Sequence, residues 1–174
     1  MSSVALKEVL NLSSKQVEKS EQATSKRIQL VVFKLGKEEY ALSLEQIKEV
    51  VRTPNISVIP HTPDFVKGVG NIRGNIMAIL DLELRFGIVT QEESDNNIGK
   101  YTLVIESSDI NLGVIVKEVP TAISITEDKI EYSPSIIYES GVDDKSVQGI
   151  VKLDDRMVIL IDFESTINQT VEIE

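Results

Sequence analysis

The chain has 174 residues and no cysteine, and its formal net charge is −10 with a sequence pI of about 4.7. An acidic chain with four Tyr, four Phe and no Trp repels phosphate backbones and offers few stacking platforms, so we expect no nucleic acid partner. The lack of cysteine excludes disulfides and thiol chemistry, and no apolar run reaches the length of a membrane span. We therefore expect a cytoplasmic protein without direct membrane insertion.

The two ends of the chain have the composition of tails. Residues 1–26 are rich in Ser, Lys, Glu and Gln, which predicts a flexible N-terminal tail. The apolar residues between Val4 and Leu10 leave a docking helix open as the alternative. Residues 169–174 are predicted to form a short C-terminal tail, so we expect the folded domain at residues 27–168.

The folded part begins with two predicted strands. Ile28–Leu35 and Glu39–Leu42 are rich in apolar and β-branched residues, and Gly36 lies in the turn between them. Apolar residues occupy both faces of the first strand. We therefore expect other elements to cover this strand on two sides.

A short helical turn, a third strand and an irregular loop are expected next. Ser43 and Gln46 form a capping-box pattern, which predicts the helical turn. Glu49–Arg52 then has the composition of a strand. The prolines of residues 54–65 indicate an extended loop after it.

One segment of the chain occurs twice. Val66–Gly87 aligns without gaps with Val147–Asn168, with matching apolar positions and identical Val, Gly, Asp and Glu residues. Each copy begins near a glycine, which permits an unusual backbone angle or a close approach. The pattern that follows predicts a hairpin and then a short helix. Asp81 and Asp162 precede these helices, so we interpret them as N-caps and not as a catalytic pair.

The chain therefore contains two related halves. Residues 28–88 and 100–168 each hold five strand candidates, and residues 88–100 form a polar connector between them. This arrangement predicts an all-β protein of two small barrels with a few short helices.

A search for catalytic and metal-binding patterns finds none. His61 is the single histidine and stands apart from any nucleophile or metal spacing, so it is interpreted as a solvated loop residue. The segment Gly68–Gly74 approaches the dinucleotide fingerprint, but Arg73 replaces its last glycine and a strand follows it. We expect no catalytic residue, no metal and no cofactor.

The two copies differ in their hairpin turns. Residues 71–74 read Asn-Ile-Arg-Gly, whereas residues 152–155 read Lys-Leu-Asp-Asp, so only the first turn presents a cation beside a glycine. Arg73 is expected to need a carboxylate partner. It is either a solvated turn residue or a charge that shapes a surface for another protein.

Several motifs resemble those of the CheW family, the bacterial chemotaxis coupling proteins. They are Leu35-Gly-Lys-Glu-Glu-Tyr40, Ile47-Lys-Glu-Val50, Phe65-Val-Lys-Gly68, Asn71-Ile-Arg-Gly74 and Ile79-Leu-Asp-Leu82. The resemblance covers about residues 27–168, with Ala78 where the family usually has Pro. It implies two five-stranded SH3-like barrels around a shared hydrophobic core. It also implies a non-catalytic adaptor, monomeric when free, that is recruited to membrane-associated receptor arrays.

The resemblance further implies two partners and the residues that bind them. The partners are the regulatory domain of the histidine kinase CheA and the cytoplasmic tip of methyl-accepting chemotaxis receptors. The residues implied for kinase binding are Val31, Leu44 and Ile47. The residues implied for receptor binding are Glu49, Arg73, Gly74, Tyr101 and Thr102, with Glu49 and Arg73 expected to pair.

Other interpretations remain open on sequence grounds. A CheW-like module serving a different receptor–kinase pathway would carry the same motifs. A fragment of the kinase is less favoured, because the chain has no ATP-binding or phosphotransfer segment, and the length excludes a fused receiver domain. An enzyme that uses a barrel cleft is a third alternative, and the missing constellation of His, Cys or paired acids argues against it.

Overall fold

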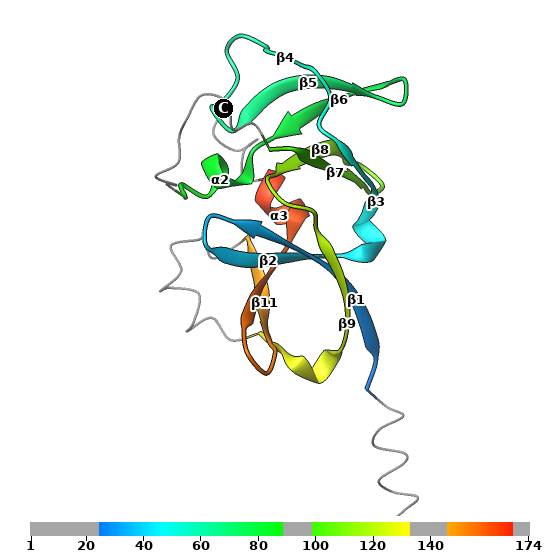
Figure 1. Cartoon of the computed structure of the whole chain (residues 1–174), viewed down its shortest axis with the longest axis vertical. Helices are drawn as coiled ribbons and strands as arrows, with labels where there is room; N and C mark the ends of the chain where they lie inside the picture. Colours follow the sequence, from blue (N-terminus) through cyan, green and yellow to red (C-terminus); the bar gives the residue numbers. More distant parts are fainter. Residues whose placement is uncertain (1–24, 89–98, 133–145, 169–174) are drawn as a thin grey trace, which may run out of the picture.

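The computed structural model describes residues 25–88, 99–132 and 146–168. These residues form two six-stranded sheets, one above the other in Figure 1, together with a few short helical turns. The predicted all-β class is therefore confirmed. Residues 1–24 of the predicted N-terminal tail, the predicted C-terminal tail, most of the connector and residues 133–145 lie outside the described residues.

The first sheet, the lower one in Figure 1, has the strand order β10-β11-β12-β2-β1-β9. Its strands are β1 (Arg27–Leu35), β2 (Glu38–Ser43), β9 (Thr121–Thr126), β10 (Ile130–Glu131), β11 (Val147–Lys152) and β12 (Met157–Ile161). The second sheet has the order β3-β7-β8-β6-β5-β4. Its strands are β3 (Ile47–Arg52), β4 (Ile56–Ser57), β5 (Val66–Ile72), β6 (Asn75–Leu80), β7 (Tyr101–Glu106) and β8 (Asn111–Val116).

The sheets do not follow the two halves of the sequence. The β1–β2 hairpin of the first half pairs with β9 and β12 of the second half, and the β7–β8 hairpin pairs with β3 and β6 of the first. The predicted bounds of about 28–88 and 100–168 therefore describe the sequence repeat, whereas each sheet draws strands from both halves. Each sheet contains five longer strands and one of two residues, β4 or β10.

The repeat extends to the details of strand pairing. β2 runs parallel to β12 with Tyr40 opposite Ile159, and β8 runs parallel to β6 with Leu112 opposite Ala78. The β5–β6 and β11–β12 hairpins each carry a bulge at the glycine that the two copies share. In β5 this glycine is Gly68, where φ is +140° and a Cβ atom would collide with the carbonyl oxygen of the neighbouring β4 strand.

The largest group of buried side chains lies between the sheets, and we call it the shared core. Its buried members are Val31, Phe33, Leu35, Tyr40, Leu42, Leu80, Leu82, Leu103, Ile105, Leu112, Val114, Val116, Val147, Ile161 and Phe163. Alternate residues of β1, such as Leu30 and Val32, instead pack in a second cluster with β9, β11 and β12. The expectation that β1 is covered on two faces is confirmed, and this burial explains why its hairpin joins the other half's strands.

The short helices follow the two hairpins as predicted. In α2 (Leu82–Arg85), Asp81 Oδ1 accepts a hydrogen bond of 3.2 Å from the Leu84 N–H. In α3 (Phe163–Asn168), Asp162 Oδ1 accepts a bond of the same length from the Ser165 N–H. Both predicted caps are confirmed.

The capping box predicted after β2 is wrong. A 3₁₀ turn, η1 (Leu44–Gln46), does form there, but Ser43 makes no side-chain capping bond. A second 3₁₀ turn, η2 (Glu127–Lys129), lies between β9 and β10 and also lacks a side-chain cap. Such a turn is too short to leave the full set of unpaired N–H groups that a capping box satisfies.

Candidate functional site

The candidate site is built on the tip of the β5–β6 hairpin. The two residues of this turn, Arg73 and Gly74, have φ values of +50° and +85°. Positive φ at both central residues is typical of the primed turns that match the twist of a tight hairpin. Asn71 Oδ1 accepts a 2.9 Å hydrogen bond from the Gly74 N–H, which fixes the turn locally.

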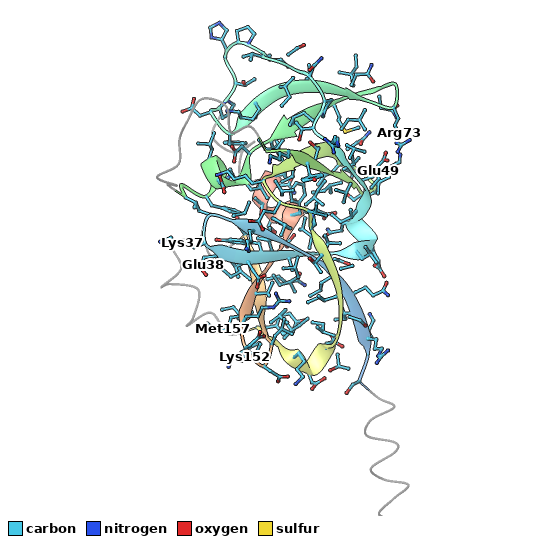
Figure 2. All side chains as sticks on the ribbon, in the orientation of Figure 1. Lys37, Glu38, Glu49, Arg73, Lys152 and Met157 are labelled. Atoms are coloured by element: carbon cyan, nitrogen blue, oxygen red, sulfur yellow. The ribbon has the colours of Figure 1, made fainter. Side chains whose placement is uncertain are left out.

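This turn directs Arg73 towards β3. The Nε atom of Arg73 lies 2.7 Å from Oε2 of Glu49, as Figure 2 shows at the right edge of the upper sheet. The Arg73 side chain is 73% exposed and that of Glu49 is 23% exposed. The predicted pairing is confirmed, and because exposed ion pairs contribute about 0–1 kcal/mol, it adds little to stability.

The equivalent positions of the other sheet cannot form this pair. Glu49 lies opposite Val104 of β7, and Thr121 of β9 lies opposite Val32 of β1. Val104 and Val32 occupy equivalent positions in the two hairpins, so Thr121 corresponds to Glu49. Asp154 corresponds to Arg73 in the repeated segment. The fold therefore forms its second hairpin without a charge pair at this position, so the repeated fold does not require one there.

The remaining residues implied for receptor binding lie at different depths. Gly74 adjoins Arg73, and a Cβ built on it would meet no atom within 4 Å. Tyr101 and Thr102 lie in β7, opposite β3 residues, so they are one strand away from Glu49. Tyr101 packs partly against the shared core, whereas Thr102 is fully buried and its Oγ1 lies 3.0 Å from Thr53 Oγ1.

The residues implied for kinase binding gather where the two sheets meet. Leu44 in η1 and Ile47 in β3 are partly buried and pack against the shared core. Val31 in β1 belongs to that core and is only 5% exposed. The three are close through this cluster, but Val31 offers almost no surface of its own.

Two exposed apolar side chains in the sheet that carries the charge pair were not anticipated from the sequence. Val50 follows Glu49 in β3 and is 42% exposed, and Ile76 lies opposite Asn71 in β6 and is 74% exposed. Both lie in apolar runs, Ile47–Val51 broken only by charges and Ile76–Leu80 unbroken. A run that is apolar on both faces does not reveal which face remains exposed.

The described residues contain no group of three or more His, Cys, Asp or Glu side chains that could hold a metal ion. None of the helices in the described ranges is long and apolar enough to cross a membrane. His61 is exposed in the loop between β4 and β5, with a φ of +63°.

Two small β-barrels around a shared core, with an exposed charge pair at a hairpin tip and exposed apolar side chains in the same sheet, are typical of a protein-interaction module. A family model described as a CheW-like domain matches residues 29–171. The chain therefore belongs to the CheW family.

Individual relatives agree with this assignment. The chain is 28% identical to "Chemotaxis protein CheW" of Treponema pallidum over 138 residues, 78% of this chain and 79% of that protein. A solved structure titled scaffolding protein TtCheW, from Thermoanaerobacter tengcongensis, superposes with a TM-score of 0.69 at 36% identity, covering 79% and 90% of the two chains. "Protein PilI" of Pseudomonas aeruginosa is 32% identical over 87 residues, 50% of this chain and 47% of that protein.

Proposed function

We propose that the chain is a non-catalytic adaptor that couples chemotaxis receptors to the histidine kinase CheA. Membership of the CheW family and the chemotaxis and scaffolding names of its relatives support this proposal. The observation that carries it is the Glu49–Arg73 pair, which stands exposed on one barrel and has no equivalent on the other. The adaptor works in the cytoplasm, is monomeric when free, and joins receptor arrays through its partners.

The receptor binds at the tip of the β5–β6 hairpin. Arg73 remains largely exposed in its pair with Glu49, so the guanidinium retains donors for a carboxylate of the receptor. Gly74 leaves open space beside it, into which a receptor helix fits. Tyr101 and Thr102 support this surface from the neighbouring strand, because they hold β7 against β3.

The kinase regulatory domain binds where the sheets meet. Leu44 and Ile47 supply partly exposed aliphatic surface, which is the kind of patch a reversible interface uses. Val31, the third residue that the resemblance implies for kinase binding, contributes to this site from the shared core, where it is 5% exposed. The two partner sites adjoin on β3, where Ile47 and Glu49 are two residues apart, and extend from there to the sheet junction and to the hairpin tip. One adaptor then binds both partners at once.

A second candidate is a CheW-like module that serves a different receptor–kinase pathway. The match to a relative named "Protein PilI" favours this alternative, although it covers only half of each chain. The two candidates differ in their partners and share the same chemistry of recognition. Binding to chemotaxis receptors separates them.

Reconstitution tests the proposal. The purified chain is added to receptor-bearing membranes and CheA, and both co-sedimentation and receptor-dependent autophosphorylation are measured. We expect kinase activation only when the chain is present. A chain that sediments with neither component would rule out the chemotaxis role, and binding to the receptor–kinase pair of another pathway would then support the second candidate.

A further inference from the structure

The carboxylate of Glu83 lies between the two sheets, away from both candidate partner sites. Glu83 belongs to α2, which follows β6 of the second sheet. Its side chain is only 14% exposed, although it carries a charge. A charge buried to this extent is stable only where partners compensate for its lost hydration.

Two partners from different parts of the fold hold this carboxylate. Oε1 of Glu83 accepts a 2.9 Å hydrogen bond from the N–H of Gly36, in the β1–β2 turn of the first sheet. Figure 1 shows α2 just above this turn, whose position the labels of Lys37 and Glu38 mark in Figure 2. Oε2 lies 3.0 Å from Nζ of Lys117, where the chain leaves β8 and crosses to β9 of the first sheet.

The other contacts between α2 and the first sheet are less directional. The rings of Phe86 and Tyr40 stack with centroids 5.8 Å apart, and the shared core adds apolar contact, which is non-directional. Hydrogen bonds to a carboxylate are short and require alignment. Glu83 therefore makes directional polar contacts from α2 to the β1–β2 turn and to the start of the connection from β8 to β9.

The repeated segment provides an internal comparison. Glu164 is identical to Glu83 in the sequence alignment of the two copies, yet its side chain is exposed. The strand registers make Ser108 equivalent to Gly36 and Glu45 equivalent to Lys117. The position that corresponds to Lys117 therefore carries no cation. The contacts of Glu83 are therefore not a general requirement of the repeated fold.

We propose that Glu83 is a positioning residue that sets the angle between the two sheets and thereby shapes the kinase-binding corner. This inference rests on the proposed adaptor function. The kinase-binding corner joins both sheets, since Leu44 lies in η1 directly after β2 of the first sheet and Ile47 begins β3 of the second, whereas Glu49 and Arg73 belong to the second sheet and its hairpin. A change of angle therefore alters the kinase corner and leaves the receptor site intact.

The test uses the full chain with Glu83→Ala, Glu83→Gln and the matched control Glu164→Ala. Residual dipolar couplings of backbone amides are fitted separately for each sheet. We expect one common alignment tensor for the wild type and Glu164→Ala, and two different tensors for Glu83→Ala. Glu83→Gln retains an acceptor for the Gly36 N–H and loses the ion pair, so its change is smaller and of the same kind.

The functional readout separates the two partner sites. Receptor-dependent kinase activation falls at least about fivefold in Glu83→Ala, the lower range of typical coupling between sites. Co-sedimentation with receptor membranes stays at the wild-type level. If Glu83→Ala does not fold, the isosteric Glu83→Gln variant carries both measurements.

The outcomes distinguish this inference from the proposed function. A single common tensor in both Glu83 variants would overturn the inference, as would an equal effect of Glu164→Ala. Wild-type chain that activates no kinase would instead overturn the proposed function, while the dipolar couplings of the free chain would still decide the role of Glu83.

Discussion

At the scale of single residues, the role of a side chain depends on its chemistry, which the sequence specifies, and on its surroundings, which the fold specifies. Arg73 is placed by a turn that only a few residues determine, so its need for a carboxylate partner was predictable. Tyr40 is different, because its polar group lies in the shared core where the phenol is desolvated. Function depends on the first residue and stability on the second.

Replacing Arg73 by Glu is expected to weaken receptor association about tenfold or more, since the change places two like charges together at the hairpin tip. The fold stays intact, because the wild-type pair is exposed. Co-sedimentation with receptor membranes measures the change. The matched control is Arg156→Glu, which breaks the Arg156–Glu39 pair at the other hairpin, where Arg156 is 43% exposed. Receptor binding at the wild-type level by Arg73→Glu would remove this residue from the site.

The titration of Tyr40 is expected to report on the shared core. Burial, with a smaller contribution from Glu38, raises the pKa of Tyr40 to about 12. The neutral phenol is favoured in the folded state, so its contribution is complete below pH ~10 and is lost as the pH rises towards 12. Urea unfolding across this range measures the loss, and Tyr40→Phe should flatten the pH dependence. An equally steep dependence in that variant would contradict the assignment.

Replacing Ile47 by Asp is expected to weaken kinase binding by about tenfold, because a charge enters an aliphatic patch. Calorimetric titration with the CheA regulatory domain measures the dissociation constant. Val58→Asp is the control, since Val58 is 81% exposed in the β4–β5 loop and outside the proposed corner. An unchanged constant for a folded Ile47→Asp variant would exclude Ile47 from the interface.

At the scale of elements, the two copies repeat the same hairpin, bulge and capped helix. The caps matter because α2 has four residues and cannot persist by its own propensity. Asp81 therefore holds the start of α2, while Glu83, two residues later, bonds to the β1–β2 turn of the neighbouring sheet. The position of α2 depends on both.

Two substitutions of Asp81 separate its cap from its charge. Asp81→Ala removes the acceptor for the Leu84 N–H and is expected to cost about 1 kcal/mol of unfolding free energy. Asp81→Asn retains an acceptor, and it removes a carboxyl whose pKa burial raises above its usual range. A raised carboxyl pKa means that stability falls as the pH rises through it. The Asn variant should therefore match or exceed the wild type at neutral pH.

Urea unfolding at neutral pH and at the lowest pH where the chain stays folded checks this sign. The advantage of Asp81→Asn over the wild type should shrink as the pH falls, because the wild-type carboxyl then becomes neutral. Asp162→Asn is the control at the other cap, where two hydrogen bonds from Ser165 meet the carboxylate. A growing advantage at low pH would show that the charge of Asp81 stabilises α2.

At the scale of the whole molecule, the exchanged hairpins make the two barrels interdependent. β1 and β2 complete a sheet whose other strands come from the second half, and β7 and β8 do the reverse. Each half alone would expose the residues that it contributes to the shared core. Neither half therefore holds a complete barrel.

Fragments 1–93 and 94–174 are expected to be unfolded when expressed separately and to form a stable complex when co-expressed. The reason is that most of the shared core and two parallel strand pairs form only between the halves. Circular dichroism and co-purification measure these outcomes. The intact chain is the control and should unfold in a single transition. Two separately folded fragments would contradict the interdependence of the barrels.

Much of the candidate site was predictable from the sequence, but the burial of its individual residues was not. Local chemistry indicated that Arg73 needs a carboxylate, and the family resemblance pointed to Glu49 as its partner, which the measured distance confirms. The same resemblance implied Val31 and Thr102, but burial depends on which strands cover them. Their roles in binding remain predictions.

The amino-acid sequence by itself determined the duplication, the hairpins, the helix caps and the all-β class, because these depend on glycines, turns and apolar periodicity within short segments. Only the tertiary structure decided that each hairpin pairs with the other half and which face of an apolar strand is exposed. It also decided that Glu83 is held between the sheets while Glu164 faces solvent. Identical local residues make different contacts because their partners are distant in the sequence, and no local pattern encodes a distant partner.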